Sequence, residues 1–151
     1  MVDRFERFSF AISEISKYWH KLAADEMERY GLKGTHSVYL LTMLKHPDGL
    51  TAPQICELCG RDKSDVSRMM SMMEANGLVI KESAHQRRYN GVFKLTEAGT
   101  KAAAHVRQRA VLAVEYAGKD LSEENRAVFY EALASILANL RTLSKEGLPE
   151  E

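Results

Sequence analysis

The sequence predicts a mainly helical α+β fold that contains one small β-hairpin. Apolar residues recur at three- and four-residue steps through most of the 151 residues, as they do in amphipathic helices. The pattern changes to short strand-like runs only between residues 78 and 95. With 45% hydrophobic and 28% charged residues, the composition is ordinary for a soluble chain and is sufficient for a core.

The N-terminal segment is predicted to be one helix that ends near Gly31. One side of this helix carries a strongly apolar seam. The seam consists of Phe5, Phe8, Ile12, Ile15, Trp19 and Leu22. Because it precedes any compact domain and is rich in aromatic residues, we expect it to contact a partner chain, with packing on its own domain as the alternative.

Two short helices are predicted next. Thr35 can cap the first of them, which ends at the turn over residues 46–49. Thr51 and Gln54 have the spacing of a capping box and begin the second, which Gly60 ends.

Asp62 is the expected N-cap of a further helix over about residues 62–76. Two short helices separated by a tight turn at Gly60 form a helix-turn-helix, in which the second helix is presented outward. The strand-like runs follow directly and predict a hairpin over about residues 79–95. A hairpin in this position is a wing.

Two long helices complete the predicted fold. Thr96 and Glu97 can cap a helix that runs to about Ala117, and Ser122 can begin a last helix rich in leucine. The fold class is therefore a winged helix-turn-helix that is mainly α with a small β-hairpin wing, flanked by helices at both ends.

The net charge of the chain is zero, which by itself argues against binding to nucleic acid. The charge is unevenly distributed, however. Residues 61–94 hold seven Lys and Arg against four Asp and Glu, whereas the rest of the chain holds 14 against 17. A basic middle between acidic ends supports an anionic partner for the winged region.

Five motifs, in this order and spacing, carry a resemblance to a known family. They are Leu50-Thr51, Lys63-Ser64-Asp65-Val66-Ser67-Arg68, Glu74-Ala75-Asn76-Gly77-Leu78-Val79, Gln86-Arg87-Arg88 and Leu95-Thr96-Glu97-Ala98-Gly99. With the order of the helices, they resemble the MarR family of winged helix-turn-helix transcription regulators over nearly the whole chain. One departure is His85-Gln86, where the family usually has an acidic residue that helps to brace the wing.

The resemblance implies three regions: an N-terminal dimerisation helix over residues 1–34, a winged helix-turn-helix DNA-binding domain over 35–96, and C-terminal dimerisation helices over 97–151. It also implies a homodimer that binds double-stranded DNA at a pseudo-palindromic operator. The common mode of the family, repression relieved by a small aromatic ligand, is the expectation here.

The candidate DNA-binding residues lie on the predicted recognition helix and in the wing. They are Lys63, Ser64, Ser67, Arg68, Arg87 and Arg88. On the helix, arginine can pair with guanine in the major groove, while lysine and serine suit phosphates or base edges. In the wing, an arginine can enter a narrow minor groove, with ordinary solvated loop charges as the alternative. For Asp65 we expect capping of its own helix rather than contact with cytosine.

Candidate residues for binding a small aromatic effector come from the first two helices. They are Tyr18, Trp19, His20, His36 and Tyr39. For each of these residues, ordinary packing is the alternative interpretation.

Cys56 and Cys59 share one helix face, so a thiol-based redox sensor is an alternative function. Their neighbours Ile55 and Leu58 favour buried packing instead, and no further Cys or His pattern supports a metal site.

The chain shows no phosphate loop, serine elbow or His-Glu metal motif, so we expect neither an enzyme nor a bound cofactor. It also has no apolar run of membrane-spanning length and no secretion signal at its N-terminus, which predicts a cytoplasmic protein. A winged-helix module that binds a protein partner remains the other alternative.

Overall fold

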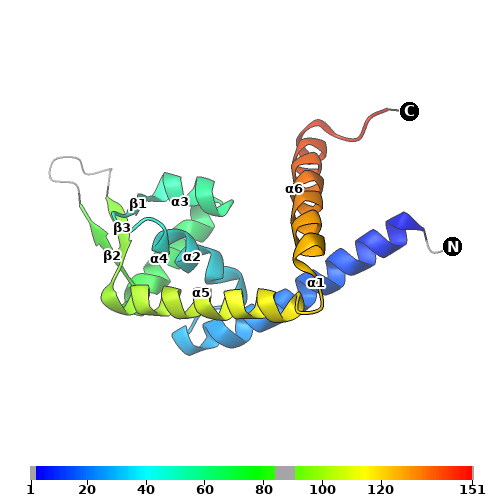
Figure 1. Cartoon of the computed structure of the whole chain (residues 1–151). Coiled ribbons are helices and arrows are strands. Elements are labelled where there is room, and N and C mark those ends of the chain that lie inside the picture. The colour runs from blue at the N-terminus through cyan, green and yellow to red at the C-terminus, as the bar shows by residue number, and fades with distance from the viewer. Residues whose placement is uncertain (1–2, 84–90, 151) are drawn as a thin grey trace. The chain divides into compact units, whose positions relative to one another are not determined.

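The computed structural model describes residues 3–83 and 91–150. The elements follow the predicted order (Figure 1). They are α1 (Arg4–Met27), η1 (Glu28–Tyr30), η2 (Gly34–His36), α2 (Ser37–Leu44), β1 (Leu50–Thr51), α3 (Ala52–Cys59), α4 (Lys63–Ala75), β2 (Val79–Glu82), β3 (Val92–Leu95), α5 (Glu97–Ala117) and α6 (Glu123–Glu146). The chain divides into two compact units, Met1–Val111 and Leu112–Glu151. No helix in the described part of the chain is long and apolar enough to span a membrane.

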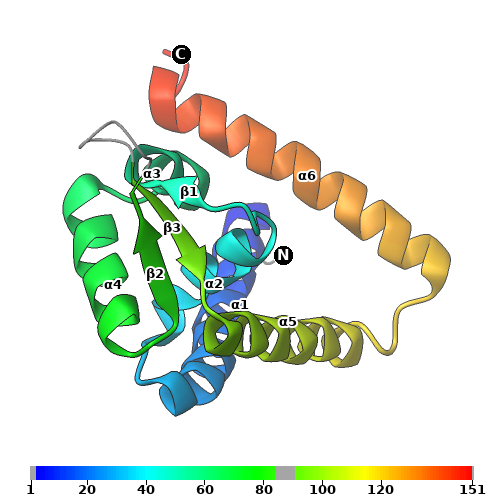
Figure 2. The same cartoon turned by 90° about the vertical axis from the view of Figure 1, so that its left-hand side faces the viewer.

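A small antiparallel sheet lies in the first unit, with the strand order β1-β3-β2. Strands β2 and β3 form the stem of the wing, pairing from Val79 with Leu95 to Glu82 with Val92. The third strand, β1, pairs Leu50 with Phe93 and was not predicted from the sequence. Figure 2 shows α4 beside β2, so the sheet and the second helix of the helix-turn-helix are packed together.

One hydrophobic core joins the helices and the sheet of the first unit. Its buried members are Met27, Leu32, Tyr39, Leu40, Met43, Leu50, Ile55, Cys59, Val66, Met69, Met70, Met73, Leu78, Val79, Phe93, Ala102, Ala103 and Val106. Burial of apolar side chains contributes about 25 cal/mol per Å² removed from water. The helix-turn-helix and the stem of the wing are thus held as one body.

The helix starts predicted from capping residues are confirmed at three places. The Gln54 amide N–H donates to Thr51 Oγ1, and the Gln54 side chain accepts from the Thr51 N–H, which completes the capping box of α3. Asp62 accepts from the Asp65 N–H at 2.8 Å and begins α4. Ser122 accepts from the Asn125 N–H at 3.1 Å and begins α6.

The prediction that Thr35 caps the second helix was wrong. Thr35 lies inside the 3₁₀ turn η2, and α2 begins only at Ser37. The turn is held because the Lys33 N–H donates to His36 Nδ1 at 3.1 Å. A Cβ on Gly34 would lie 2.7 Å from the Ala24 nitrogen, so η2 packs directly on the backbone of α1.

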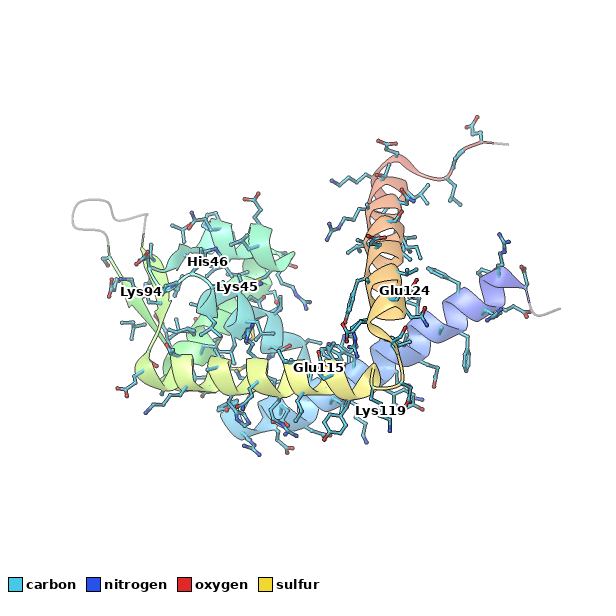
Figure 3. All side chains as sticks on the ribbon, viewed as in Figure 1. Lys45, His46, Lys94, Glu115, Lys119 and Glu124 are labelled. Atoms are coloured by element: carbon cyan, nitrogen blue, oxygen red, sulfur yellow. The ribbon has the colours of Figure 1, made fainter. Side chains whose placement is uncertain are left out.

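In the second unit, Arg126 holds the turn between α5 and α6. Its Nη2 donates to the Gly118 carbonyl at 2.9 Å, and its Nη1 lies 3.7 Å from Glu115 Oε2. Figure 3 labels Glu115 on α5, Lys119 in the turn and Glu124 at the start of α6. The guanidinium therefore adds a second hydrogen bond to the Gly118 carbonyl, which also accepts from the Leu121 N–H, and lies beside a carboxylate of α5.

Candidate nucleic-acid interface

The N-terminal half of α4 presents one polar, basic face to solvent. Lys63, Ser64, Ser67 and Arg68 are all exposed, as the helical spacing from Asp62 predicted. The Arg68 side chain is 75% exposed. A guanidinium with this exposure can donate hydrogen bonds to a ligand outside the chain.

The opposite face of α4 is anchored in the core. Val66, Met69, Met70 and Met73 are each at most 2% exposed. Because these residues fall on the i, i+3, i+4 and i+7 positions of the helix, the exposed residues between them are held in a defined orientation. The candidate interface is therefore a face of a packed helix rather than a loop.

Asp65 does not act as the helix cap that we expected. Asp62 is the cap, and the Asp65 carboxylate instead contacts side chains on both sides. The Tyr39 hydroxyl, from α2, donates a hydrogen bond to Asp65 Oδ2, and Arg68 Nη2 lies 3.7 Å from Asp65 Oδ1. The sequence did not predict this contact between Tyr39 and Asp65, because the two residues lie 26 positions apart.

Arg61, just before α4, connects the helix-turn-helix to η2. Its Nη2 donates to the Thr35 carbonyl at 3.4 Å. Burial lowers the pKa of the adjacent His36, although the Asp65 carboxylate acts in the opposite direction. With Nδ1 accepting from the Lys33 N–H, the neutral ring carries its proton on Nε2.

In the wing, Arg87 and Arg88 lie outside the described residues. The stem carries two lysines that the sequence reasoning did not select. Lys81 lies over the Phe93 ring, with Nζ 5.4 Å from its centroid, whereas Lys94 Nζ is 2.9 Å from Glu82 Oε2. The hydrogen bond with Glu82 raises the pKa of Lys94.

Figure 3 labels Lys94 on β3 and Lys45 and His46 at the end of α2. His46 Nδ1 lies 2.9 Å from the Thr42 carbonyl and closes the last turn of this helix. Among the described residues, Lys81 and Lys94 of the wing stem and Lys45 and His46 at the end of α2 are thus further basic side chains outside α4.

The predicted effector residues are distributed over α1, η2 and α2. Tyr18 and Trp19 are exposed on α1, and the His20 ring lies 3.5 Å from Ser16 Oγ on the same helix. His36 and Tyr39 form a tilted ring pair with centroids 6.5 Å apart. Tyr39 is fully buried and packs in the hydrophobic core of the first unit.

The two cysteines lie on α3 as free thiols. Cys56 is half-buried and Cys59 is buried, with Sγ 4.0 Å from the Val38 carbonyl. Burial raises the pKa of the Cys59 thiol, which disfavours the reactive thiolate. Within residues 3–83 and 91–150, no cluster of three His, Cys, Asp or Glu side chains is arranged to hold a metal ion.

Ser71 is a further candidate that the sequence reasoning missed. It is exposed on α4, three and four positions beyond Arg68 and Ser67. It therefore continues the exposed polar face by one turn. The signal was present in the sequence as a serine at every third or fourth position from Ser64.

Taken together, a three-stranded sheet, a helix-turn-helix with an exposed basic face and a hairpin after its second helix define a winged-helix protein. Residues 30–88 match the sequence model of the MarR family. No curated protein sequence matches the chain.

Solved structures of regulators from this family share the fold along nearly their whole length. A MarR transcriptional regulator from Methanosarcina mazei is 19% identical with a TM-score of 0.78, covering 91% of this chain and 99% of the other. A Listeria monocytogenes structure assigned to the family, complexed with a 26-mer DNA, is 19% identical with a TM-score of 0.77, covering 100% and 99%. The Staphylococcus aureus MepR–DNA complex is 20% identical with a TM-score of 0.78, covering 87% and 97%.

The match over residues 30–88 and the shared fold confirm the resemblance seen in the sequence. Residues 30–88 of this chain thus match the MarR family, and its fold is that of solved MarR-family transcriptional regulators.

Proposed function

We propose that this chain is a sequence-specific, double-stranded DNA-binding transcription regulator, with α4 in the major groove and the wing on the minor groove. The observation that carries the proposal is the exposed face of Lys63, Ser64, Ser67 and Arg68 on a helix whose other side is locked into the core. Solved structures of two proteins with this fold, from Listeria monocytogenes and Staphylococcus aureus, contain DNA.

Each exposed side chain suits a particular contact. Arg68 can donate two parallel hydrogen bonds to guanine O6 and N7, a contact worth about 1–3 kcal/mol of discrimination. Ser64 and Ser67 suit base edges or phosphates, and Lys63 suits a phosphate. Arg87 and Arg88 extend the interface to the minor groove as part of the same proposal.

A homodimer completes this function, because two recognition helices about 34 Å apart read successive major grooves of a pseudo-palindrome. The apolar seam of α1 supports a dimer: Phe5, Ile15 and Leu22 are each more than half exposed. Helix α6 also exposes large apolar side chains. They include Val128, Phe129, Leu133, Ile136, Leu137 and Leu140. Exposed apolar surface of this kind marks a protein interface.

The test is binding of the protein to a labelled duplex from its own upstream region and to a scrambled duplex, followed by fluorescence anisotropy at several salt concentrations. We expect tighter binding to the upstream duplex, with an affinity that falls as salt rises because phosphate contacts release counterions. Equal, weak binding to both, with no duplex enriched in a genome-wide selection, would instead favour a protein partner.

Arg68→Ala should remove discrimination at one base pair of each half-site. The expected loss is about 5- to 150-fold in relative affinity, the equivalent of one bidentate contact. Arg107→Ala, an exposed arginine on α5, is the matched control and should retain the discrimination. If Arg68→Ala retained the wild-type base preferences, our assignment of Arg68 would be wrong.

We also propose that a small aromatic ligand releases the DNA, binding near Tyr18, Trp19, His20, His36 and Tyr39. Two observations support this part. The backbone of η2 packs on the α1 turn that holds His20, and the neutral His36 ring, with Nδ1 accepting from the Lys33 N–H, carries an Nε2–H that can donate to a ligand. Trp19 is the single tryptophan of the chain, so its fluorescence reports on this region directly. A panel of small phenols and aromatic acids should change that fluorescence and weaken DNA binding at the same ligand concentrations.

A further inference from the structure

The Asp65 carboxylate occupies an unusual place for an acidic group in a DNA-binding helix. It lies in the first turn of α4, beside the exposed basic face, and its side chain is 31% exposed. An unpaired carboxylate there would repel the phosphates of an approaching duplex. The carboxylate is not used to cap the helix, because Asp62 performs that task.

The carboxylate is held from the core side by Tyr39. The tyrosine ring is fully buried in α2, and its hydroxyl donates to Asp65 Oδ2. Burial, reinforced by the carboxylate, raises the pKa of Tyr39, so the hydroxyl stays protonated and remains a donor at neutral pH. A hydrogen bond to a charged acceptor from a rigid donor fixes the orientation of the acceptor.

The other carboxylate oxygen faces Arg68. Nη2 of the guanidinium lies 3.7 Å from Asp65 Oδ1, one helical turn away. An arginine side chain that is otherwise 75% exposed has many rotamers, and restricting them before binding reduces the entropy lost in the complex. The contacts thus form a chain from the core of α2, through Asp65, to the guanidinium on the exposed face.

We propose that Tyr39 and Asp65 are positioning residues that set the base preference of Arg68 without contacting DNA. The proposal rests on the proposed function of α4 in the major groove. A positioning role for Tyr39 and Asp65 makes a different prediction from a purely structural role. A structural role predicts that losing the hydrogen bond weakens binding to every duplex alike, whereas a positioning role predicts a loss of discrimination at the base pair that Arg68 reads.

The test uses the full-length protein, its best-bound duplex and all single-base-pair variants of that duplex. Arg68→Ala first identifies the base pair that Arg68 reads. Tyr39→Phe, which removes only the hydroxyl and keeps the ring in the core, should lower discrimination at that same pair by about three- to tenfold, the size of one hydrogen bond. Discrimination at the other pairs and the salt dependence should not change.

Asp65→Asn is the second variant, because it preserves shape while removing the charge that attracts Arg68. It should lower discrimination at the same base pair, and the double variant with Tyr39→Phe should lose no more than Asp65→Asn alone. Because Asp65 is partly exposed, we expect Asp65→Asn to fold, and it therefore tests the proposal even if Tyr39→Phe lowers the thermal stability. Tyr116→Phe, which removes an exposed hydroxyl on α5, is the matched control and should behave as the wild type.

Two results would overturn the proposal, and they are distinguishable. If Arg68→Ala abolished discrimination at one base pair but Tyr39→Phe and Asp65→Asn retained it, the positioning role would be wrong and the proposed function would stand. If the wild type preferred no duplex, both the proposed function and the positioning role would fail.

Discussion

At the scale of single residues, the Glu26 carboxylate of α1 contacts two side chains of α5. Its Oε1 accepts from Arg109 Nε at 2.7 Å, and its Oε2 lies 3.3 Å from His105 Nε2. Arg29 Nη1 approaches the same histidine nitrogen at 3.3 Å. The hydrogen bond with Arg109 lowers the pKa of Glu26 below its ordinary value of 4.5.

Glu26→Gln should therefore destabilise the protein in a pH-dependent way. A carboxyl whose pKa is lowered by folding stabilises the fold fully above its ordinary pKa of 4.5, and this contribution is lost as the pH falls through the lower folded value. We expect the variant to unfold with a free energy about 1 kcal/mol smaller than the wild type at pH 7.

The measurement is urea denaturation of both proteins at pH 7, 5.5 and 3.5. The difference between them should shrink at the lowest pH, where the wild-type carboxyl begins to be protonated. A difference that stayed constant from pH 7 to 3.5 would show that the ion pair does not account for the loss. Glu28→Gln, on the exposed turn after α1, provides the matched control.

At the scale of elements, the first turn of α5 packs against the short segment between α4 and β2. The Thr96 N–H donates to the Leu78 carbonyl at 3.0 Å, and its hydroxyl donates to the Gly77 carbonyl at 2.6 Å. Gly99 is buried in the same contact, and a Cβ there would collide with the Leu78 carbonyl oxygen. The contact therefore joins the start of α5, which follows the wing, to the residues directly before β2.

Gly99→Ala should destabilise the first unit by about 3 kcal/mol, at the upper end of the range for overpacking, because the added methyl group would meet backbone atoms of Leu78 rather than a flexible side chain. Thr100→Ala, at the exposed neighbouring position, should change stability by less than about 0.5 kcal/mol. Thermal unfolding followed by circular dichroism compares the two. Equal melting temperatures for Gly99→Ala and Thr100→Ala would show that the helix can shift to accept the methyl group.

At the scale of the whole molecule, α6 exposes a row of large apolar side chains in the single chain. Leu133, Ile136, Leu137 and Leu140 recur at helical spacing, and each is more than a third exposed. The repeat places them on one face of the helix. A face of this kind is stable in water when a partner covers it.

Leu137→Asp should accordingly shift the protein from dimer to monomer, because a carboxylate buried in an apolar interface loses its hydration without a partner charge. Ser135→Asp, on the opposite face of α6, is the matched control and should leave the dimer intact. Sedimentation velocity at several concentrations distinguishes the two. A wild type that sediments as a monomer would contradict the proposed dimer. The monomeric variant should also lose the affinity that comes from two half-sites.

The sequence by itself determined the order and type of the main elements, because these depend on local interactions. Helical periodicity located the helices, and the caps at Thr51, Asp62 and Ser122 follow from side chains that reach their own first turn. The change from helical periodicity to short strand-like runs also located the strands of the wing. The exposed face of α4 followed in the same way, because burial of Val66 and Met70 sets which residues between them face solvent.

Only the tertiary structure decided which distant residues meet. The strand β1 exists because Leu50 pairs with Phe93, and two residues are too few to give a periodic signal. Asp65 is bound by Tyr39, 26 positions away, and Glu26 by Arg109, 83 positions away. Such partners depend on how whole elements pack, since a hydrogen bond needs both groups placed within a few tenths of an ångström. Local pattern therefore specifies the elements and their exposed faces, whereas packing specifies the contacts that hold and orient the candidate site.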